Sequence, residues 1–221
     1  AKESRGINSV GEISFLEIMS DILSEMRSPY IPIAKAKKNE NGQDVYEITG
    51  TAIFKGDKFF TEIFAKDSQG LLWTKGKISD NYLIVEDKNN IYAILIGSSN
   101  VFWTVEIKND KPIFNIYIIT SGEVQETIGD NRRISDDELT KKIKKLATEE
   151  IKKEVKSVIN TTAVKNGIDV LDLTPLLMQR EPKFWKENQK DFENIIKNAT
   201  YNVYVSFNID KIGLELSGKI T

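Results

Sequence analysis

Residues 50–78 read GTAIFKGDKFFTEIFAKDSQGLLWTKGKI, a stretch whose turn formers and apolar residues predict a hairpin followed by a short helix. Residues 51–55 alternate in the manner of a strand, and residues 59–64 form a second apolar-rich run. Gly56 and Asp57 lie between the two runs and suit a tight turn, because glycine adopts positive φ without steric cost. We expect the two runs to pair as strands.

A short helix is expected directly after this hairpin. Asp67 and Ser68 are good N-cap residues, and the Leu-Leu-Trp run that ends at Trp73 supplies an apolar side. Gly76 is a typical residue for the end of a helix. The whole stretch therefore predicts a unit of two strands and one helix.

The upstream residues predict another helix and further strands. Apolar residues recur at helical spacing over residues 10–26, so we expect an amphipathic helix that packs on another element. Residues 33–37 and 45–55 are strand-like and are joined by a polar, turn-rich segment. We therefore predict that residues 1–78 form a smaller α+β domain of a helix, three strands and a short helix, incomplete at its N-terminal side.

The remaining residues, 79–221, predict a second α+β domain. Turn formers separate four strand-like runs that are expected to form a meander, at residues 82–86, 91–97, 101–108 and 113–127. A capping box that begins at Ser135 predicts a long helix to about residue 165. The expected inward stripe of this helix is Leu139, Ile143, Leu146, Ile151, Val155, Val158 and Ile159.

Shorter elements are expected at the C-terminal end. Prolines punctuate two helical segments, near residues 176–179 and 183–196, and residues 201–209 alternate as a strand. We expect residues 212–220 to pair back on that strand, with Asp210 and Lys211 near the turn. The predicted fold class is α+β with two mixed helix/sheet domains, the C-terminal one an antiparallel-rich sheet packed against a long helix and shorter helices.

The composition favours neither nucleic acid nor an anionic membrane surface as a partner. The 221 residues carry 31 Lys and Arg against 33 Asp and Glu, a net charge of −2. The longest apolar run, residues 91–96, is far shorter than the ~20 residues of a membrane-spanning helix, so we expect a soluble chain.

The sequence also lacks the residues that most catalytic and metal sites use. Histidine and cysteine are absent, and no Gly-rich phosphate loop or serine nucleophile motif is present. The carboxylates of residues 136–138 are explained by the dipole of the long helix. We predict no catalytic residue, no cofactor and no metal site, and we expect Trp73, Trp103 and Trp185 to be core anchors more than a ligand platform.

In its ordered residues, the stretch 50–78 resembles the hallmark segment of the C subunit of spore germinant receptors, the Ger(x)C lipoprotein family. The matching residues are Gly50, Thr51, Ala52, Phe54, Lys55, Asp57, Lys58, Ser68, Gly70, Leu71, Leu72, Trp73 and Gly76. The chain departs from that pattern at Thr61, Asp67 and Gln69, where the family commonly carries Gly, Glu and Arg.

The second half of the chain resembles the C-terminal domain of the same family. The matching residues are Gly122, Glu126, Asp169, Val170, Leu171, Pro182, Trp185, Val203, Val205, Ile209 and Gly213. Asp172 stands where the family usually has Gly, and Phe192 stands where a Trp is common. The resemblance covers the chain from about residue 10 onward and corresponds to the family without its N-terminal domain.

The resemblance implies a non-catalytic lipoprotein subunit of a spore germinant receptor, acting in assembly and signalling during nutrient-triggered germination. It implies the integral-membrane A and B subunits as partners, and a place on the outer face of the spore inner membrane through a lipid anchor outside these residues. Two alternatives remain open. A lipid-anchored module that binds a germinant or cell-wall fragment needs a pocket with convergent polar groups, and a peptidoglycan enzyme needs two carboxylates roughly 5–10 Å apart.

If the chain is a receptor subunit, the stretch from residue 50 to Gly76 is the best candidate for a contact surface. The candidate interface residues are Lys55, Asp57, Lys58, Asp67, Gln69 and Gly70. The same stretch is equally consistent with a purely structural role, in which it closes the first domain and links it to the second.

Overall fold

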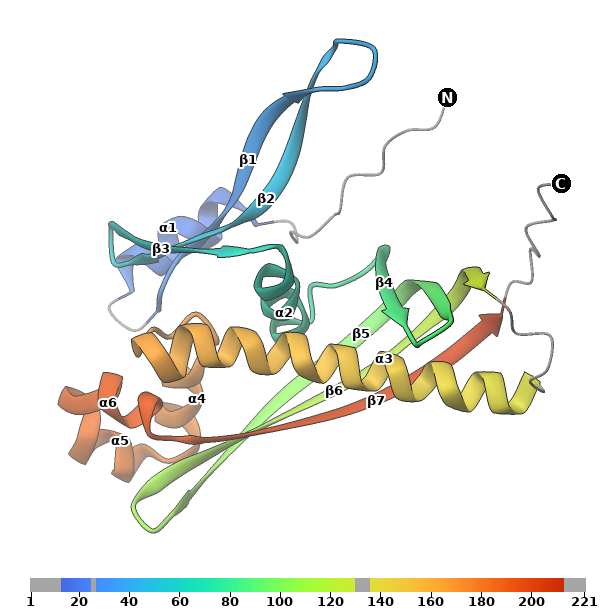
Figure 1. The fold of residues 1–221 in the computed structure, drawn as a ribbon. Helices are drawn as coiled ribbons and strands as arrows, with labels where there is room; N and C mark the ends of the chain where they lie inside the picture. Colours follow the sequence, from blue (N-terminus) through green and yellow to red (C-terminus); the bar gives the residue numbers. More distant parts are fainter. Residues whose placement is uncertain (1–12, 25–26, 130–135, 213–221) are drawn as a thin grey trace, which may run out of the picture.

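The computed structural model describes residues 13–24, 27–129 and 136–212, which build two sheets and a set of helices (Figure 1). The first sheet has the strand order β1-β2-β3 and the second has the order β4-β5-β6-β7. The strands are β1 (Tyr30–Lys38), β2 (Asp44–Lys55), β3 (Lys58–Phe64), β4 (Asn81–Glu86), β5 (Asn90–Lys108), β6 (Lys111–Gly129) and β7 (Thr200–Ile212). All strand pairs except β6–β7 are antiparallel, and helices pack against the sheets, which confirms the α+β class.

The helices are α1 (Phe15–Leu23), α2 (Ala65–Lys75), α3 (Asp136–Ile159), α4 (Leu173–Arg180), α5 (Pro182–Asn188) and α6 (Phe192–Lys197). A π-helical segment, Asn160–Val164, continues α3, and a short 3-10 turn joins α5 to α6. None of the helices in the described ranges is long and apolar enough to cross a membrane.

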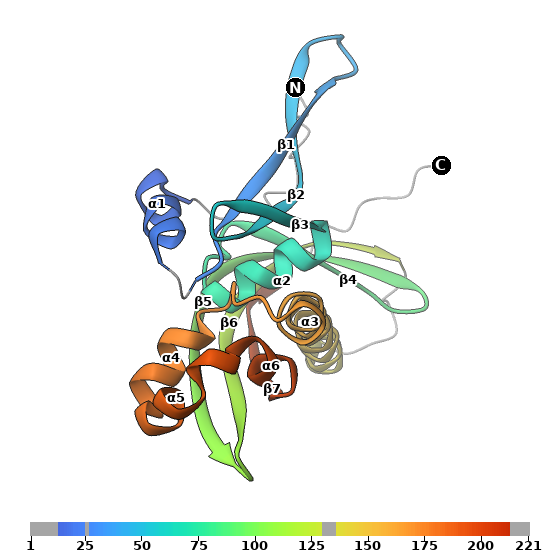
Figure 2. The same ribbon diagram turned by 90° about the vertical axis from the view of Figure 1, so that its left-hand side faces the viewer.

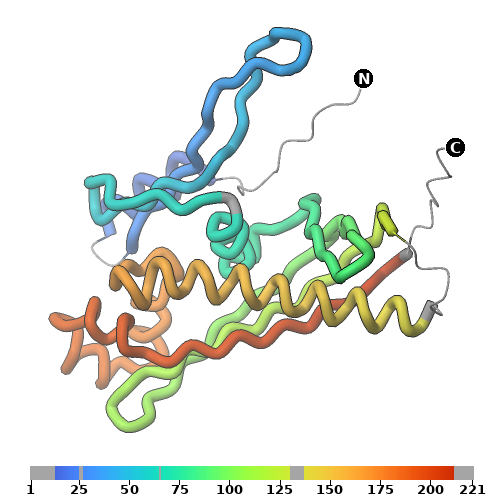
Figure 3. Tube along the Cα trace, viewed as in Figure 1, coloured from blue at the N-terminus to red at the C-terminus, as the bar shows by residue number. Residues whose placement is uncertain are grey.

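The first sheet is a ribbon whose far end stands away from the rest of the chain (Figures 1, 2 and 3). At that end the Asn39 carboxamide oxygen accepts hydrogen bonds from the backbone of Asn41 and Gln43, at 3.0 and 2.9 Å. Only the base of the ribbon reaches the core, through residues such as Ile53 and Ile63. The base therefore anchors this sheet while the β1–β2 turn projects into solvent.

The N-terminal helix is packed less well than its pattern predicts. Ser14 caps α1 in a capping box with Glu17, whose N–H lies 3.1 Å from the Ser14 hydroxyl. No residue of α1 is buried, and Phe15, Leu16 and Leu23 are exposed. The expected packing is therefore limited to half-buried residues such as Ile18 and Ile22, and the outer parts of the predicted range 10–26 lie outside the described residues.

The start of α2 differs from the sequence prediction. The helix begins at Ala65, directly after β3, and Phe64 occupies the N-cap position without a side-chain cap. Ser68 therefore lies inside the helix, where its hydroxyl accepts a hydrogen bond from the Thr51 hydroxyl at 2.9 Å and donates one to the Ile63 carbonyl at 3.3 Å. The prediction of a cap at Asp67 and Ser68 is wrong, because a tertiary contact with β2 uses the Ser68 hydroxyl.

In the second sheet, two predicted strands join into one. The predicted break at Ser98-Ser99-Asn100 pairs with β6 like the residues around it, and a register shift lies between Ile96 and Ser98. Such a bulge bends a strand without reversing it. The predicted runs 91–97 and 101–108 therefore belong to the single strand β5.

The last strand pairs in a direction that the sequence did not indicate. β7 runs parallel to β6, and Lys211 pairs with Glu123 within the sheet. The predicted turn at Asp210 and Lys211 is therefore wrong, since sheet pairing continues through it to Ile212. The predicted return strand lies mostly in residues 213–221, outside the described residues.

The core is continuous between the two sheets. Helices α2 and α3 pack on one face of the β4–β7 sheet (Figures 1 and 2), and all predicted stripe residues of α3 belong to the core or pack against it. The same buried cluster includes Ile53 of β2, Trp73 of α2 and Phe207 of β7. The division into residues 1–78 and 79–221 stays a prediction, and the two segments share this one cluster.

Candidate functional site

Three of the candidate interface residues surround the β2–β3 turn. Gly56 has φ +61, as the predicted tight turn requires, and Lys55 pairs with Lys58 across it. Lys55, Asp57 and Lys58 are all exposed. Within the described part of the chain, the side chains of Asp57 and Lys58 form no hydrogen bond or ion pair. These two charges are therefore available to a partner.

Lys55 is the exception, because it links the turn to the C-terminal helices. Its ammonium group lies 2.5 Å from the Glu193 carboxylate of α6, and both side chains are more than half exposed. An ion pair of this kind contributes little to stability, but it positions the turn beside α6.

The other three candidate residues lie on α2 and face inward to different degrees. Gly70 is buried where α2 crosses α3, and a Cβ atom added there would lie 2.3 Å from the Glu154 carbonyl oxygen. Asp67 and Gln69 are partly buried, and Asp67 accepts a hydrogen bond from the Thr161 hydroxyl at 3.1 Å. Gly70 therefore has a role inside the fold, where it allows the backbones of α2 and α3 to approach each other.

A buried carboxylate marks the same helix crossing. The indole N–H of Trp73, fully buried, donates a hydrogen bond to Glu154 of α3 at 2.9 Å. Glu154 is 5% exposed, and burial raises its pKa to about 7 against the lowering effect of this hydrogen bond. Sequence reasoning missed Glu154 because charged residues surround it, although its spacing from Ile151 and Val158 places it on the inward stripe of α3.

The C-terminal end of α2 is fixed by a second charged contact. The predicted stop at Gly76 is confirmed, with φ +63. One residue earlier, the Lys75 ammonium group lies 2.6 Å from the Asp172 carboxylate. The same carboxylate forms a second ion pair with Arg27, at 3.5 Å. Asp172 itself has φ +62, a conformation that suits glycine best. This conformation explains why glycine is the usual family residue at the position that Asp172 occupies.

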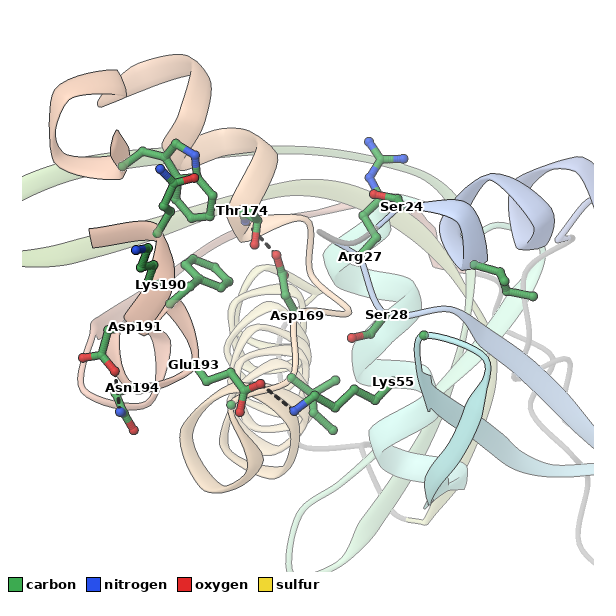
Figure 4. A pocket seen from close by; sticks show the side chains of 17 residues that line it. Ser24, Arg27, Ser28, Lys55, Asp169, Thr174, Lys190, Asp191, Glu193 and Asn194 are labelled. Atoms are coloured by element: carbon green, nitrogen blue, oxygen red, sulfur yellow. Dashed lines mark hydrogen bonds and ion pairs between the residues drawn. The ribbon is translucent and has the colours of Figure 1, made fainter. Parts of the chain in front are cut away.

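Beside Lys55 the chain encloses a cleft of about 600 Å³ (Figure 4). The β2–β3 turn, the segment before β1, residues 167–169 and helices α4 to α6 form its walls. The lining residues are Ile22, Ser24, Arg27, Ser28, Lys55, Gly56, Gly167, Ile168, Asp169, Thr174, Trp185, Gln189, Lys190, Asp191, Phe192, Glu193 and Asn194. In the described ranges no three acidic side chains gather closely enough to hold a metal ion.

The floor of the cleft is built around a buried carboxylate. Asp169 accepts backbone hydrogen bonds from Leu171, Leu173 and Thr174 at 3.2, 2.9 and 2.6 Å, and so occupies the N–H groups at the start of α4. Burial raises the pKa of Asp169, against these hydrogen bonds. The buried Thr174 side chain lies beside the same carboxylate and, together with these backbone N–H groups, lowers the Asp169 pKa against the effect of burial. The sequence did not indicate this floor, because its residues meet only through the tertiary fold.

The three tryptophans occupy different environments. Trp73 is a fully buried core residue, as expected, and Trp103 is partly buried with its indole N–H 3.3 Å from the Thr74 carbonyl. Trp185 instead lines the cleft and makes an edge contact with Phe192, with ring centroids 5.3 Å apart. The expectation of a core anchor is therefore wrong for Trp185, whose ring is half-buried.

Comparison with known proteins decides the family. The family model described as "Spore germination B3/ GerAC like, C-terminal" matches residues 49–213, which include the whole β2–β3 turn, α2 and the walls of the cleft from α4 to α6. The chain belongs to this family. The resemblance of residues 50–78 to germinant receptor C subunits is thereby confirmed.

Two further comparisons show the extent of the likeness of this GerAC-like chain to known proteins. Spore germination protein B3 of Bacillus subtilis (strain 168) is 22% identical over 184 residues, which cover 83% of the chain and 49% of that protein. The crystal structure of the GerBC protein matches with a TM-score of 0.73 at 20% identity, over 94% of the chain and 66% of that structure. The chain thus spans about half the length of the curated relative, and its fold is that of GerBC.

Proposed function

We propose that this chain is a non-catalytic part of a spore germinant receptor, acting in assembly and signalling. The proposal extends the role in spore germination that family membership supports. Its partners would be the integral-membrane A and B subunits, and a lipid anchor outside these residues would hold it on the outer face of the spore inner membrane.

The observation that carries the assembly role is the exposure of the β2–β3 turn. Asp57 and Lys58 have no partner within the described residues, and the adjacent Phe59 and Phe60 are 60% and 43% exposed. Two free charges beside exposed aromatic rings form a surface typical of protein contacts, in which aromatic anchors are surrounded by polar groups. The turn is anchored at its base, because β2 pairs with β3 from Gly50 to Lys55, with one register shift between Ile53 and Phe54.

The test is the double variant Asp57→Ala/Lys58→Ala, studied in the full-length protein in spores and in the purified chain. We expect unchanged thermal stability of the purified chain, together with reduced recovery of the receptor complex and slower germination. The matched control is Glu86→Ala/Lys88→Ala, which removes one acidic and one basic exposed residue near the β4–β5 turn.

Two results would contradict the proposal. If both double variants assemble and germinate like the unmodified protein, the β2–β3 turn is not a contact surface. If the two variants impair assembly equally, the effect belongs to surface charge in general and the turn has no special role.

A further inference from the structure

The face of the β4–β7 sheet that points away from α2 and α3 carries a row of three aromatic rings. Phe102 of β5 pairs with Tyr117 of β6, which in turn pairs with Tyr204 of β7. The rings stack in this order, with centroids 4.7 and 4.9 Å apart. The neighbours of Tyr117 along β6, Ile116 and Ile118, are buried on the opposite face, as strand alternation requires. We call Phe102, Tyr117 and Tyr204 the aromatic row.

The aromatic row is exposed to solvent although it is large and mostly apolar. Phe102 and Tyr204 are 49% and 48% exposed, and Ile119, the next residue of β6 on the same face, is 49% exposed. Stacking of the rings stabilises the sheet, but it leaves about half of the surface of Phe102 and Tyr204 in water. A contiguous apolar patch of this kind is a common mark of a protein contact.

The two rows of side chains beside the aromatic row are uncharged. On one side, the Asn202 amide donates a hydrogen bond to the Asn115 carboxamide oxygen at 2.8 Å, and the Asn115 amide donates one to the Thr104 hydroxyl at 3.3 Å. The row on the other side consists of Asn100, Ile119 and Ser206. An uncharged patch of aromatic, amide and hydroxyl groups has no attraction for nucleic acid or an anionic membrane, and it is typical of the centre of a protein interface.

The pattern is symmetric about Tyr117, which favours a second copy of the same chain as the partner. Aromatic rings flank Tyr117 on both neighbouring strands, and uncharged rows lie before and after it along β6. A two-fold axis that runs along the aromatic row would place one aromatic row over the other and each uncharged row over another uncharged row. The same axis reverses the direction of the strands between the two copies.

The charges beyond the uncharged rows fit this reversal. Lys111 and Glu123 lie six residues before and six residues after Tyr117, and strand alternation places both on its face. Glu123 accepts a hydrogen bond from Gln125 at 3.2 Å, and neither Lys111 nor Glu123 forms an ion pair with another described residue. When the strands are reversed, Lys111 of each copy faces Glu123 of the other, so the two ends of the surface are complementary in charge.

We propose that this face of the β4–β7 sheet is the contact surface of a symmetric dimer of the chain. The two aromatic rows form the centre of the contact, the uncharged rows surround it, and the pairs of Lys111 with Glu123 fix the direction of the strands. The β2–β3 turn belongs to the other sheet, so the dimer and the proposed contact with other receptor subunits use different surfaces.

The test is sedimentation velocity of the purified chain between about 1 and about 200 µM, the range of typical reversible protein contacts. We expect a shift from monomer to dimer in this range. Tyr204→Lys places two like charges in the centre of the contact, so the Kd of the dimer should rise by about tenfold or more. Tyr46→Lys is the matched control, because Tyr46 is 81% exposed on the first sheet. A chain that stays monomeric throughout, or equal Kd values for the two variants, overturns the proposal.

Charge reversal tests the direction of the strands without changing the aromatic row. Lys111→Glu and Glu123→Lys each place like charges opposite each other, so we expect the Kd of either variant to rise by about threefold to tenfold. The double variant Lys111→Glu/Glu123→Lys restores opposite charges and should return the Kd close to that of the unmodified chain. A double variant that dimerises no more tightly than the single variants overturns the proposed arrangement. Because these measurements need no other subunit, their failure leaves the receptor role untouched.

Discussion

Helix α2 and the β2–β3 turn belong to one continuous stretch of sequence, yet their environments are opposite. In α2, Leu71, Leu72 and Trp73 are 1%, 3% and 0% exposed, and Gly70 lies against the backbone of α3. In the turn, Asp57 and Lys58 are exposed and have no partner among the described residues. A family hallmark can therefore combine residues required by the fold with residues available for contact, and substitutions separate the two.

The largest expected effect is that of Gly70→Val. A side chain at this position meets the Glu154 carbonyl, which belongs to the backbone and cannot rotate away, so α2 must separate from α3. We expect a loss of about 3 kcal/mol or more in the free energy of unfolding, measured by urea denaturation. Gly97→Val is the control, since nothing lies within 4 Å of a Cβ atom there and valine suits a strand. Equal stability of the two variants would show that the helix crossing tolerates a side chain.

The next effect depends on pH and concerns Glu154. Because the folded-state pKa of Glu154 is about 7, above the ordinary value of 4.5, the native state binds this proton more tightly than the unfolded chain. The associated stability is fully present below pH 4.5 and is lost as the pH rises through about 7. Glu154→Gln keeps an acceptor for Trp73 and removes the titration, so we expect a gain of up to about 3 kcal/mol at pH 8.

Thermal unfolding between pH 5 and pH 8 checks this expectation. The melting temperature of the unmodified chain should fall over this range by more than that of Glu154→Gln. The surface variant Glu149→Gln, on the same helix, serves as the control and should follow the unmodified chain. Parallel pH profiles for all three proteins would mean that Glu154 has an ordinary pKa.

A smaller effect is expected at Asp172, which anchors the end of α2. Asp172→Ala removes the ion pair with Lys75, whose side chain is only 12% exposed, and keeps a side chain at φ +62. We expect a loss of about 2 kcal/mol. Asp172→Gly removes the same ion pair but relieves the backbone, so it should be about 1 kcal/mol more stable than Asp172→Ala. If both variants unfold at the same urea concentration, the backbone at this position is not strained.

The smallest effect on stability belongs to the turn itself. Asp57→Ala/Lys58→Ala removes two exposed side chains without partners in the described chain, so the free energy of unfolding should change by less than about 0.5 kcal/mol. Urea denaturation of the purified chain measures this value. A loss as large as that of Asp172→Ala would assign the turn to the fold and remove the contrast with α2.

Local patterns predicted most elements but not how distant elements meet. The β2–β3 turn and the stop at Gly76 follow from backbone preferences of single residues, which is why they could be predicted. The start of α2 could not, because the Ser68 hydroxyl bonds to Thr51 of another element. The parallel pairing of β7 depends equally on contacts across the chain, and strand alternation is the same for either direction.

The candidate site shows the same division. The sequence indicated the accessible charges Asp57 and Lys58 through their place in a turn. It did not indicate the cleft, because Asp169 and Trp185 come to line the same cleft only after α4 and α5 have folded against each other. The burial of Glu154 could have been predicted, since its spacing places it on the buried stripe of α3 despite its charge.

The crossing of α2 and α3 also sets an order of events during synthesis. Trp73 and Glu154 are 81 residues apart in the chain, so α2 can contact β2 and β3 but not α3 when it leaves the ribosome. Contacts of such high sequence separation slow folding, because a long loop must close before they form. The side of α2 that carries Trp73 would therefore become fixed only after α3 is complete.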